Sequence, residues 1–219
     1  IFNGYSYSNS YKKWSINYDG PLMNTSFNTV QGYNTKIGLS YFKRNEDKNT
    51  YYQFGSSLAY GFSDEKFRPT AYFSSKLSNK SKSYLTVFGG NSVNQFNREE
   101  PISKLINSIS TLFFKNNFMK LYEKNFISAS FSREMFNGLN MSLGLEYSER
   151  KPLFNTTDYS IIKSDDLYTS NNPFTPLTET QLFPTHSSFN INATLSYTIG
   201  QRYTTTPYAK RYEISKYPR

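Results

Sequence analysis

Residues 127–148, ISASFSREMFNGLNMSLGLEYS, decide the fold class. In the second half of this stretch every other position is apolar, namely Leu139, Met141, Leu143, Leu145 and Tyr147. The positions between them are polar, charged or glycine. A period of two places the apolar side chains on one face of a β-strand. The first half alternates in the same way, and Asn137-Gly138 lies near the middle, so the stretch predicts a β-hairpin with one apolar and one polar face.

The length of the loop sets which residues pair. A two-residue loop would place Glu134 on the apolar face. A three-residue loop at 136–138 pairs Met135 with Leu139 and keeps every apolar residue on its own face, with Gly138 in the left-handed conformation. We therefore expect the three-residue loop. The further pairs are then Arg133 with Met141, Phe131 with Leu143, Ala129 with Leu145 and Ile127 with Tyr147.

Several other stretches alternate in the same way. The clearest are 33–41, 52–62 and 189–199. Arms of about nine or ten residues have the length that a tilted strand needs to cross a bilayer. A soluble β-sandwich shows the same alternation, so the hairpin leaves both architectures open.

The composition is compatible with a transmembrane barrel and equally with a sandwich. The chain has 219 residues, 37% of them hydrophobic, with 20 Tyr and 19 Phe. Its mean hydropathy is −0.66 and no run is long enough for a transmembrane helix. Transmembrane barrels are this polar because half of each strand faces the lumen, and aromatic residues form girdles at their two interfaces. The alternative is a Tyr-rich extracellular β-sandwich.

Charge and cysteine content exclude several classes. The absence of cysteine excludes disulfides and Cys-based metal sites. The net charge of +9 comes from residues scattered through turns, without the basic stripe of a nucleic-acid-binding protein. We expect no nucleic-acid partner, and we attribute the charge to anionic lipid headgroups.

The remaining elements follow in chain order. We expect one or two strands in 4–19 and a weaker strand in 84–93. Phe62 is expected to pair with Phe67 across a turn at 63–66, which sets Tyr60 opposite Pro69, where a bulge or a strand end would accommodate the proline. A last segment, from Tyr208 to Ile214, begins another strand. The total is about eight to ten strands.

Two long connections separate these strands, at 94–124 and 149–187. The first carries apolar residues at helical spacing after Pro101, and we expect a short helix that packs its apolar stripe on the protein; a membrane-surface helix is the alternative. If each strand crosses once, both connections lie on one rim, and the turns at 136–138 and after Gly200 lie on the other. Outer-membrane barrels have long loops outside and short turns inside, so we assign the connections to the cell exterior.

The two ends predict a part of a longer polypeptide. The first residue is Ile1 and the stretch that follows reads as strand, while the final residues SKYPR lack the alternation of a closing strand. We expect residues 1–219 to be one outer-membrane β-barrel segment, with sequence before and after it.

Several stretches resemble a known family. They are SYKKWSINYDGPL (10–22), FNTVQGYNTKIGLSY (27–41), YGFSDEKFRP (60–69), the whole of 118–160, YTSNNPF (168–174) and FPTH (183–186). In this order they resemble a Bacteroidota family of outer-membrane barrels of unknown function, named for an N-terminal carboxypeptidase-regulatory-like domain. The resemblance implies an outer-membrane location, a periplasmic domain before residue 1 and further barrel strands after residue 219. It transfers no catalytic residue.

Candidate chemistry is sparse. His186 lies beside Ser187 and Ser188, but adjacent strand residues point to opposite faces, so we read it as an ordinary loop histidine and not as part of a nucleophilic site. Asp158, Asp165 and Asp166 could hold calcium, yet their spacing matches no known calcium loop, so solvated charges are favoured.

Four further residues lie on the central hairpin. Glu134, Glu146 and Asn140 fall on its polar face, where the two carboxylates could line a lumen or, more commonly, pair with Lys or Arg on neighbouring strands. Arg133 falls on the apolar face near the turn, where its side chain can reach the interface. We predict no catalytic, cofactor-binding or metal-binding residue.

These expectations combine into a ranked function. We expect an all-β, antiparallel transmembrane β-barrel segment in a Gram-negative outer membrane, in contact with lipid and lipopolysaccharide. Its first-ranked role is a non-enzymatic accessory or scaffold subunit of an outer-membrane assembly for protein export or barrel insertion, with other outer-membrane proteins as partners. A passive or substrate-selective pore is second, and a lipid-modifying enzyme is a distant third. No cofactor and no small-molecule substrate is expected.

Overall fold

The structure is a computed structural model that describes residues 2–97, 99, 101–162 and 166–213. It contains one α-helix, α1 (Lys104–Phe114), and a 3-10 turn, η1 (Leu22–Asn24). The strands are β1 (Tyr5–Asn9), β2 (Trp14–Asp19), β3 (Ser26–Asn28), β4 (Gly32–Asn45), β5 (Thr50–Gly61), β6 (Lys66–Ser78), β7 (Ser83–Gln95), β8 (Leu121–Phe136), β9 (Leu139–Pro152), β10 (His186–Tyr197), β11 (Tyr203–Thr206) and β12 (Ala209–Tyr212).

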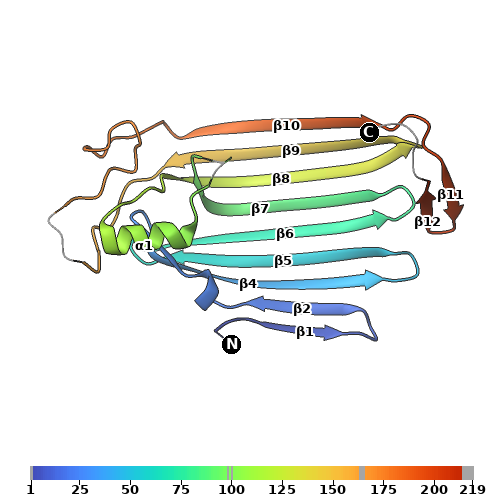
Figure 1. The fold of residues 1–219 in the computed structure, drawn as a ribbon, viewed down its shortest axis with the longest axis horizontal. Coiled ribbons are helices and arrows are strands. Elements are labelled where there is room, and N and C mark those ends of the chain that lie inside the picture. Colours follow the sequence, from blue (N-terminus) through green and yellow to red (C-terminus); the bar gives the residue numbers. More distant parts are fainter. Residues whose placement is uncertain (1, 98, 100, 163–165, 214–219) are drawn as a thin grey trace.

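Ten of these strands form one antiparallel sheet (Figure 1). Its order is β1-β2-β4-β5-β6-β7-β8-β9-β10, with the short β3 paired to β4, while β11 and β12 form a separate hairpin. The predicted antiparallel all-β fold is therefore confirmed. Within the described residues the sheet is not closed into a barrel, because β1 and β10 are not paired with each other and remain its two edges.

The central hairpin has the predicted register but not the predicted loop. Ile127 pairs with Tyr147 and Arg133 with Met141, as expected. Near the turn the register shifts between Glu134 and Phe136, and Phe136 pairs with Leu139. Met135 is therefore the unpaired residue of a β-bulge. The loop has only two residues, Asn137 and Gly138, and because of the bulge the apolar residues beyond it still lie on the predicted face. Gly138 has φ +83°, the left-handed conformation that was predicted.

The β5–β6 register was predicted wrongly. Tyr60 pairs with Phe67 and Leu58 with Pro69, a shift of two residues that leaves every side chain on its predicted face. Pro69 lies within β6, not at a bulge or a strand end. It is accommodated because the ladder between β6 and β7 begins at the next residue, Thr70.

The apolar face of the sheet is exposed. Phe54, Leu143 and Leu195 are 54%, 37% and 69% exposed. In the alternative sandwich they would lie between two stacked sheets, but the other sheet in the described part of the chain is the small β11–β12 hairpin. The sandwich reading is therefore wrong for the structure described.

The buried core lies at one end of the sheet. The buried apolar side chains are Phe27, Val30, Leu112, Met119, Leu121 and Tyr122. They belong to α1, to the segment around β3 and to the start of β8. The first connection (96–120) and the second connection (153–185) both lie at this end, and the turn between β8 and β9 lies at the other (Figure 1), as predicted. The short turn between β5 and β6 lies at the same end as the two connections.

Helix α1 forms where it was predicted, but it packs its polar side on the protein and exposes most of its apolar stripe. Its buried side chains are Asn107, Thr111 and Leu112. The exposed ones include Leu105, Ile106, Ile109, Phe113 and Phe114. The expectation that the apolar stripe packs on the protein is therefore wrong, because the polar side chains of α1 bond to the neighbouring segments. No helix in the described part of the chain is long and apolar enough to cross a membrane.

Candidate functional site: the rim platform

The two long connections and the β3 region form one packed unit, which we call the rim platform. It comprises residues 25–31, α1, residues 116–121 and the described residues of 153–172. Asn107 of α1 lies at its centre and is fully buried. Its side-chain oxygen accepts bonds from the backbone N–H groups of Phe118 (3.1 Å) and Met119 (3.0 Å). Its NH₂ group donates to Thr111 and Asn117, so all of its bonding capacity is used.

Thr29 joins this centre to the second connection. The side-chain NH₂ of Asn117 donates to the Thr29 hydroxyl (2.6 Å), and that hydroxyl donates to Asn155 (2.5 Å). The hydroxyl of Thr156 donates to the carbonyl of Val30 (2.7 Å). Three segments far apart in sequence are thus held by buried or partly buried hydrogen bonds, which are costly to leave unmade.

Asn171 holds the second connection against the sheet. Its side-chain oxygen accepts from the backbone N–H of Leu121 (2.8 Å), and its NH₂ donates to the carbonyls of Leu121 (2.7 Å) and Leu153 (2.6 Å). These bonds continue the ladder beyond the ends of β8 and β9. The second connection is therefore ordered where it meets the sheet.

Tyr168 links the same connection to α1. Its hydroxyl lies 2.8 Å from the carbonyl oxygens of Thr111 and of Tyr159. Burial raises the pKa of Tyr168 to about 12, and the negative charge of Asp158 adds to the shift. The hydroxyl therefore stays protonated, as a donor, throughout the physiological pH range.

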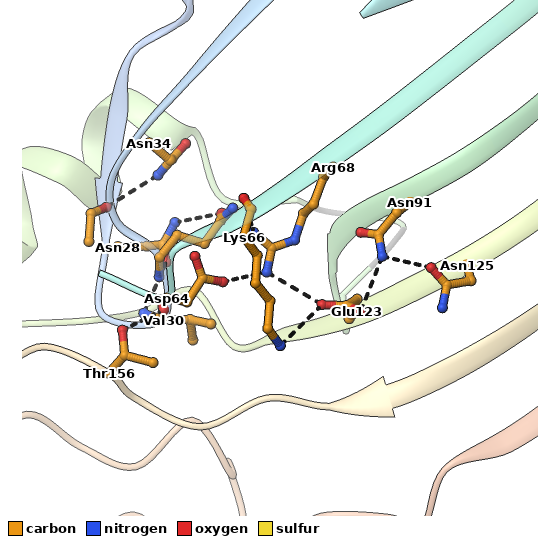
Figure 2. Close-up of polar contacts among 12 residues, drawn as sticks. Asn28, Val30, Asn34, Asp64, Lys66, Arg68, Asn91, Glu123, Asn125 and Thr156 are labelled. Atoms are coloured by element: carbon orange, nitrogen blue, oxygen red, sulfur yellow. Dashed lines mark hydrogen bonds and ion pairs between the residues drawn. The ribbon is translucent and has the colours of Figure 1, made fainter. Parts of the chain in front are cut away.

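A buried charge cluster lies beside the platform at the start of β6 (Figure 2). Arg68, 2% exposed, bonds through Nη2 to Asp64 and, at 3.4 Å, to Glu123 of β8. Asn91 of β7 donates to the second oxygen of Glu123 (3.1 Å) and to Asn125 (2.6 Å). The cluster thereby joins β6, β7 and β8 where they meet the connections.

His186 is the first residue of β10 and not, as predicted, a loop residue. Its Nδ1 lies 3.0 Å from the carbonyl oxygen of Pro184, and its ring contacts Phe183. The hydroxyl of Ser187 is bonded to that of Tyr147 (3.1 Å). No serine hydroxyl in the described residues bonds to the imidazole, so the geometry gives the histidine no nucleophile to activate.

Two of the aspartates considered for calcium, Asp158 and Asp166, lie beside Lys115. The ammonium group of Lys115 lies 3.0 Å from a carboxylate oxygen of Asp158 and donates to the backbone carbonyl of Asp166 (2.9 Å). Asp165 lies outside the described residues. Among the residues that are described, no three His, Cys, Asp or Glu side chains gather closely enough to hold a metal ion.

The hairpin carboxylates are both paired. Glu134, 3% exposed, accepts from Lys210 of β12 (2.7 Å) and from Tyr212 (2.5 Å). Glu146 pairs with Lys124 of β8 at 2.8 Å. Glu146 therefore pairs with a neighbouring strand, the commoner of the two predicted roles, whereas Glu134 pairs with a strand of the separate β11–β12 hairpin. Asn140 lies opposite Glu134 in the ladder, and Arg133 is exposed, as predicted.

Sequence reasoning missed most of the platform. Asn107, Thr29, Asn171 and Arg68 belong to no motif with a known chemical role, and the partners of Thr29 and Asn171 lie far away in the chain. The signal that could have found them is the density of Asn and Thr in segments otherwise read as loops, such as Asn116-Asn117 and Asn171-Asn172. Buried amides in loops satisfy backbone groups that no ladder reaches.

Comparison with known proteins gives one match. The model of the C-terminal domain of a family of unknown function, DUF5686, matches residues 1–219. The chain belongs to this family. The match covers the same sheet and rim platform described above, and the family's description assigns them no activity. No curated protein and no solved structure matches this DUF5686 domain.

Proposed function

We propose that the sheet lies in the outer membrane of a Gram-negative bacterium as part of a transmembrane β-barrel. The observation that carries the proposal is the apolar face, whose large side chains are exposed on β4, β5, β6, β8, β9 and β10. A continuous apolar surface of this size is unfavourable in water and favourable in hydrocarbon. The resemblance to a Bacteroidota family of outer-membrane barrels supports the same location.

Strand length and aromatic placement agree with this proposal. Strands β4 to β10 have 12 to 16 residues each, more than a tilted crossing needs. Near the short turns Trp14 stacks on Tyr41, which contacts Tyr52 of β5. At the other end of β5, Tyr60 contacts Phe67. From residue 52 to residue 60 the strand rises about 26 Å, close to the roughly 25 Å apolar band between aromatic girdles.

For the role of this barrel we propose a non-enzymatic accessory or scaffold subunit of an outer-membrane assembly, for protein export or barrel insertion. The rim platform is ordered, yet it presents large apolar side chains outside the strands. On α1 and beside it these exposed side chains include Leu105, Ile106, Ile109, Phe114, Ile161 and Ile162. The N–H of Ile161 bonds to the carbonyl of Leu112 (2.9 Å), so the exposed stripe of α1 continues into the second connection. Such rigid apolar surfaces are typical of protein interfaces.

The test is co-purification from native membranes, with subunits identified by mass spectrometry. The variant Ile106→Lys/Ile109→Lys places two charges on the stripe, and Asn116→Lys/Gln181→Lys adds the same charges to exposed polar positions. We expect outer-membrane subunits with the wild type and the second variant and their loss with the first. Loss with both variants, or no partner with the wild type, would contradict the scaffold role.

The polar face favours a pore as the second candidate. Serine and threonine hydroxyls on this face bond to one another across strands, as Ser57 does with Thr70 (2.7 Å) and Ser74 with Thr86 (3.3 Å). A polar-faced wall of this kind lines the lumen of porins. Conductance in planar bilayers would favour the pore. A lipid-modifying enzyme ranks last, and unchanged activity on lipid in His186→Ala would exclude a role for that histidine.

A further inference from the structure

A hollow of about 640 Å³ lies where the polar face of the sheet meets the start of α1. Its wall includes Lys36 of β4, Ser57 of β5, and Arg68 and Thr70 of β6. Lys104 and Leu105, the first residues of α1, complete it. The volume suits a small polar ligand or a headgroup.

The charged side chains that line the hollow are all cations. They are Lys36, Arg68 and Lys104, and no carboxylate from the described residues lines it. Arg68 is neutralised by Asp64 and Glu123. In the described part of the chain neither lysine has a carboxylate within ion-pair distance. The hollow therefore carries about two positive charges that the protein does not balance.

The two lysines face each other closely enough to interact. Desolvation lowers the pKa of Lys104, and the positive charge of Lys36 lowers it further. Two like charges held near each other are destabilising, and an anion between them would remove that cost.

A further donor points to an oxyanion. The N-cap residue of α1, Ser103, also lines the hollow and makes no side-chain capping bond, and the first turn contains no acidic residue. The positive end of the helix is therefore uncompensated there.

We propose that this hollow binds a phosphate group. Cations from β4, β6 and α1 converge on it with a helix N-terminus, and several cations around one doubly charged tetrahedral group is the arrangement that phosphate recognition uses. The exposed side chains of Leu22 and Met23, which also line the hollow, suit the uncharged remainder of the ligand. The phosphate could belong to a soluble sugar phosphate or to a lipid headgroup, which share this chemistry.

The experiment titrates the folded full chain in non-ionic detergent with glucose 1-phosphate and inorganic phosphate by calorimetry, with methyl glucoside as the ligand without charge. A second arm measures binding to phosphatidylcholine vesicles with and without phosphatidic acid. The variant Lys36→Ala/Lys104→Ala removes the unbalanced charges. The matched control Lys48→Ala/Lys80→Ala removes the same charge from exposed turns at the opposite end of the sheet.

We expect binding of at least one phosphate source, weakened about tenfold or more by the hollow variant and little changed by the control. Binding of glucose 1-phosphate or inorganic phosphate would show that a soluble phosphate is sufficient as the ligand. Binding only to vesicles that contain phosphatidic acid would identify the ligand as a lipid headgroup. Absence of binding in both arms, or equal weakening by both variants, overturns the proposal. Neither result bears on the membrane location of the sheet, since binding is measured on the folded chain.

Discussion

Gly138 and Gly144 belong to the same hairpin but differ in what a side chain would meet. Gly138 has φ +83°, and a Cβ there would lie 2.6 Å from the backbone oxygen of Thr198. At Gly144 the nearest atom would be 3.8 Å away, and φ is not positive. We predict that Gly138→Ala lowers the free energy of unfolding by about 1–3 kcal/mol, whereas Gly144→Ala changes it by less than about 0.5 kcal/mol. Urea unfolding in detergent measures both; equal effects would contradict the turn geometry.

Arg68 holds two carboxylates that would otherwise be buried without a counter-charge. Removing one partner of a buried ion pair typically costs about 3–5 kcal/mol, because the remaining charge stays desolvated. We predict a loss of this size for Arg68→Ala. The control is Lys13→Ala, which breaks an exposed pair with Glu46 (3.1 Å) and should cost less than about 1 kcal/mol. A small effect at Arg68 would mean that Asp64 and Glu123 are solvated.

At this scale the sequence predicted which residues share a face, but not the local irregularities. The alternation from Ile127 to Tyr147 was sufficient for the register of the central hairpin. The bulge at Met135 was not predictable, because a two-residue loop with a bulge and a three-residue loop satisfy the same pattern. One partner of Arg68 was not predictable for another reason: Glu123 lies on β8, which is separated from β6 by β7 and is distant in the chain.

Among the elements, α1 shows most clearly that the spacing of apolar residues predicts a helix but not which of its sides is buried. The spacing from Ile102 to Phe113 predicted a helix and its position. It did not say which side would be covered, because that depends on the buried amides and hydroxyls of Asn107 and Thr111. The β5–β6 pairing was undecided in the same way, since a shift of two residues preserves both faces.

The reversed packing of α1 gives a prediction at the scale of the element. Leu112 is 8% exposed and lies on the packed side, whereas Ile106 is 60% exposed. We predict that Leu112→Ala lowers the free energy of unfolding of the rim platform by about 2–5 kcal/mol and that Ile106→Ala changes it by less than about 0.5 kcal/mol. Limited proteolysis across 153–162 reports platform opening. Equal protection of both variants would contradict this orientation of the helix.

For the whole molecule, the two faces of the sheet and its rim make three different surfaces. The sequence predicted the apolar and polar faces, the two long connections and their common rim. The packing of those connections was not predictable, because their order comes from side-chain bonds between segments distant in the chain, such as Thr29 and Asn155 or Asn171 and Leu121. The one substantial core lies in this rim, while the strands leave their apolar side chains uncovered.

The central claim is that the apolar face contacts lipid and the polar face contacts water. Because the chain has no cysteine, spin labels can be placed singly on β5 at Phe54→Cys and Leu58→Cys for the apolar face, and at Gln53→Cys and Ser57→Cys for the polar face. In lipid vesicles we predict that the first pair collides mainly with oxygen and the second mainly with a water-soluble nickel complex. High nickel accessibility at all four positions would contradict the membrane assignment.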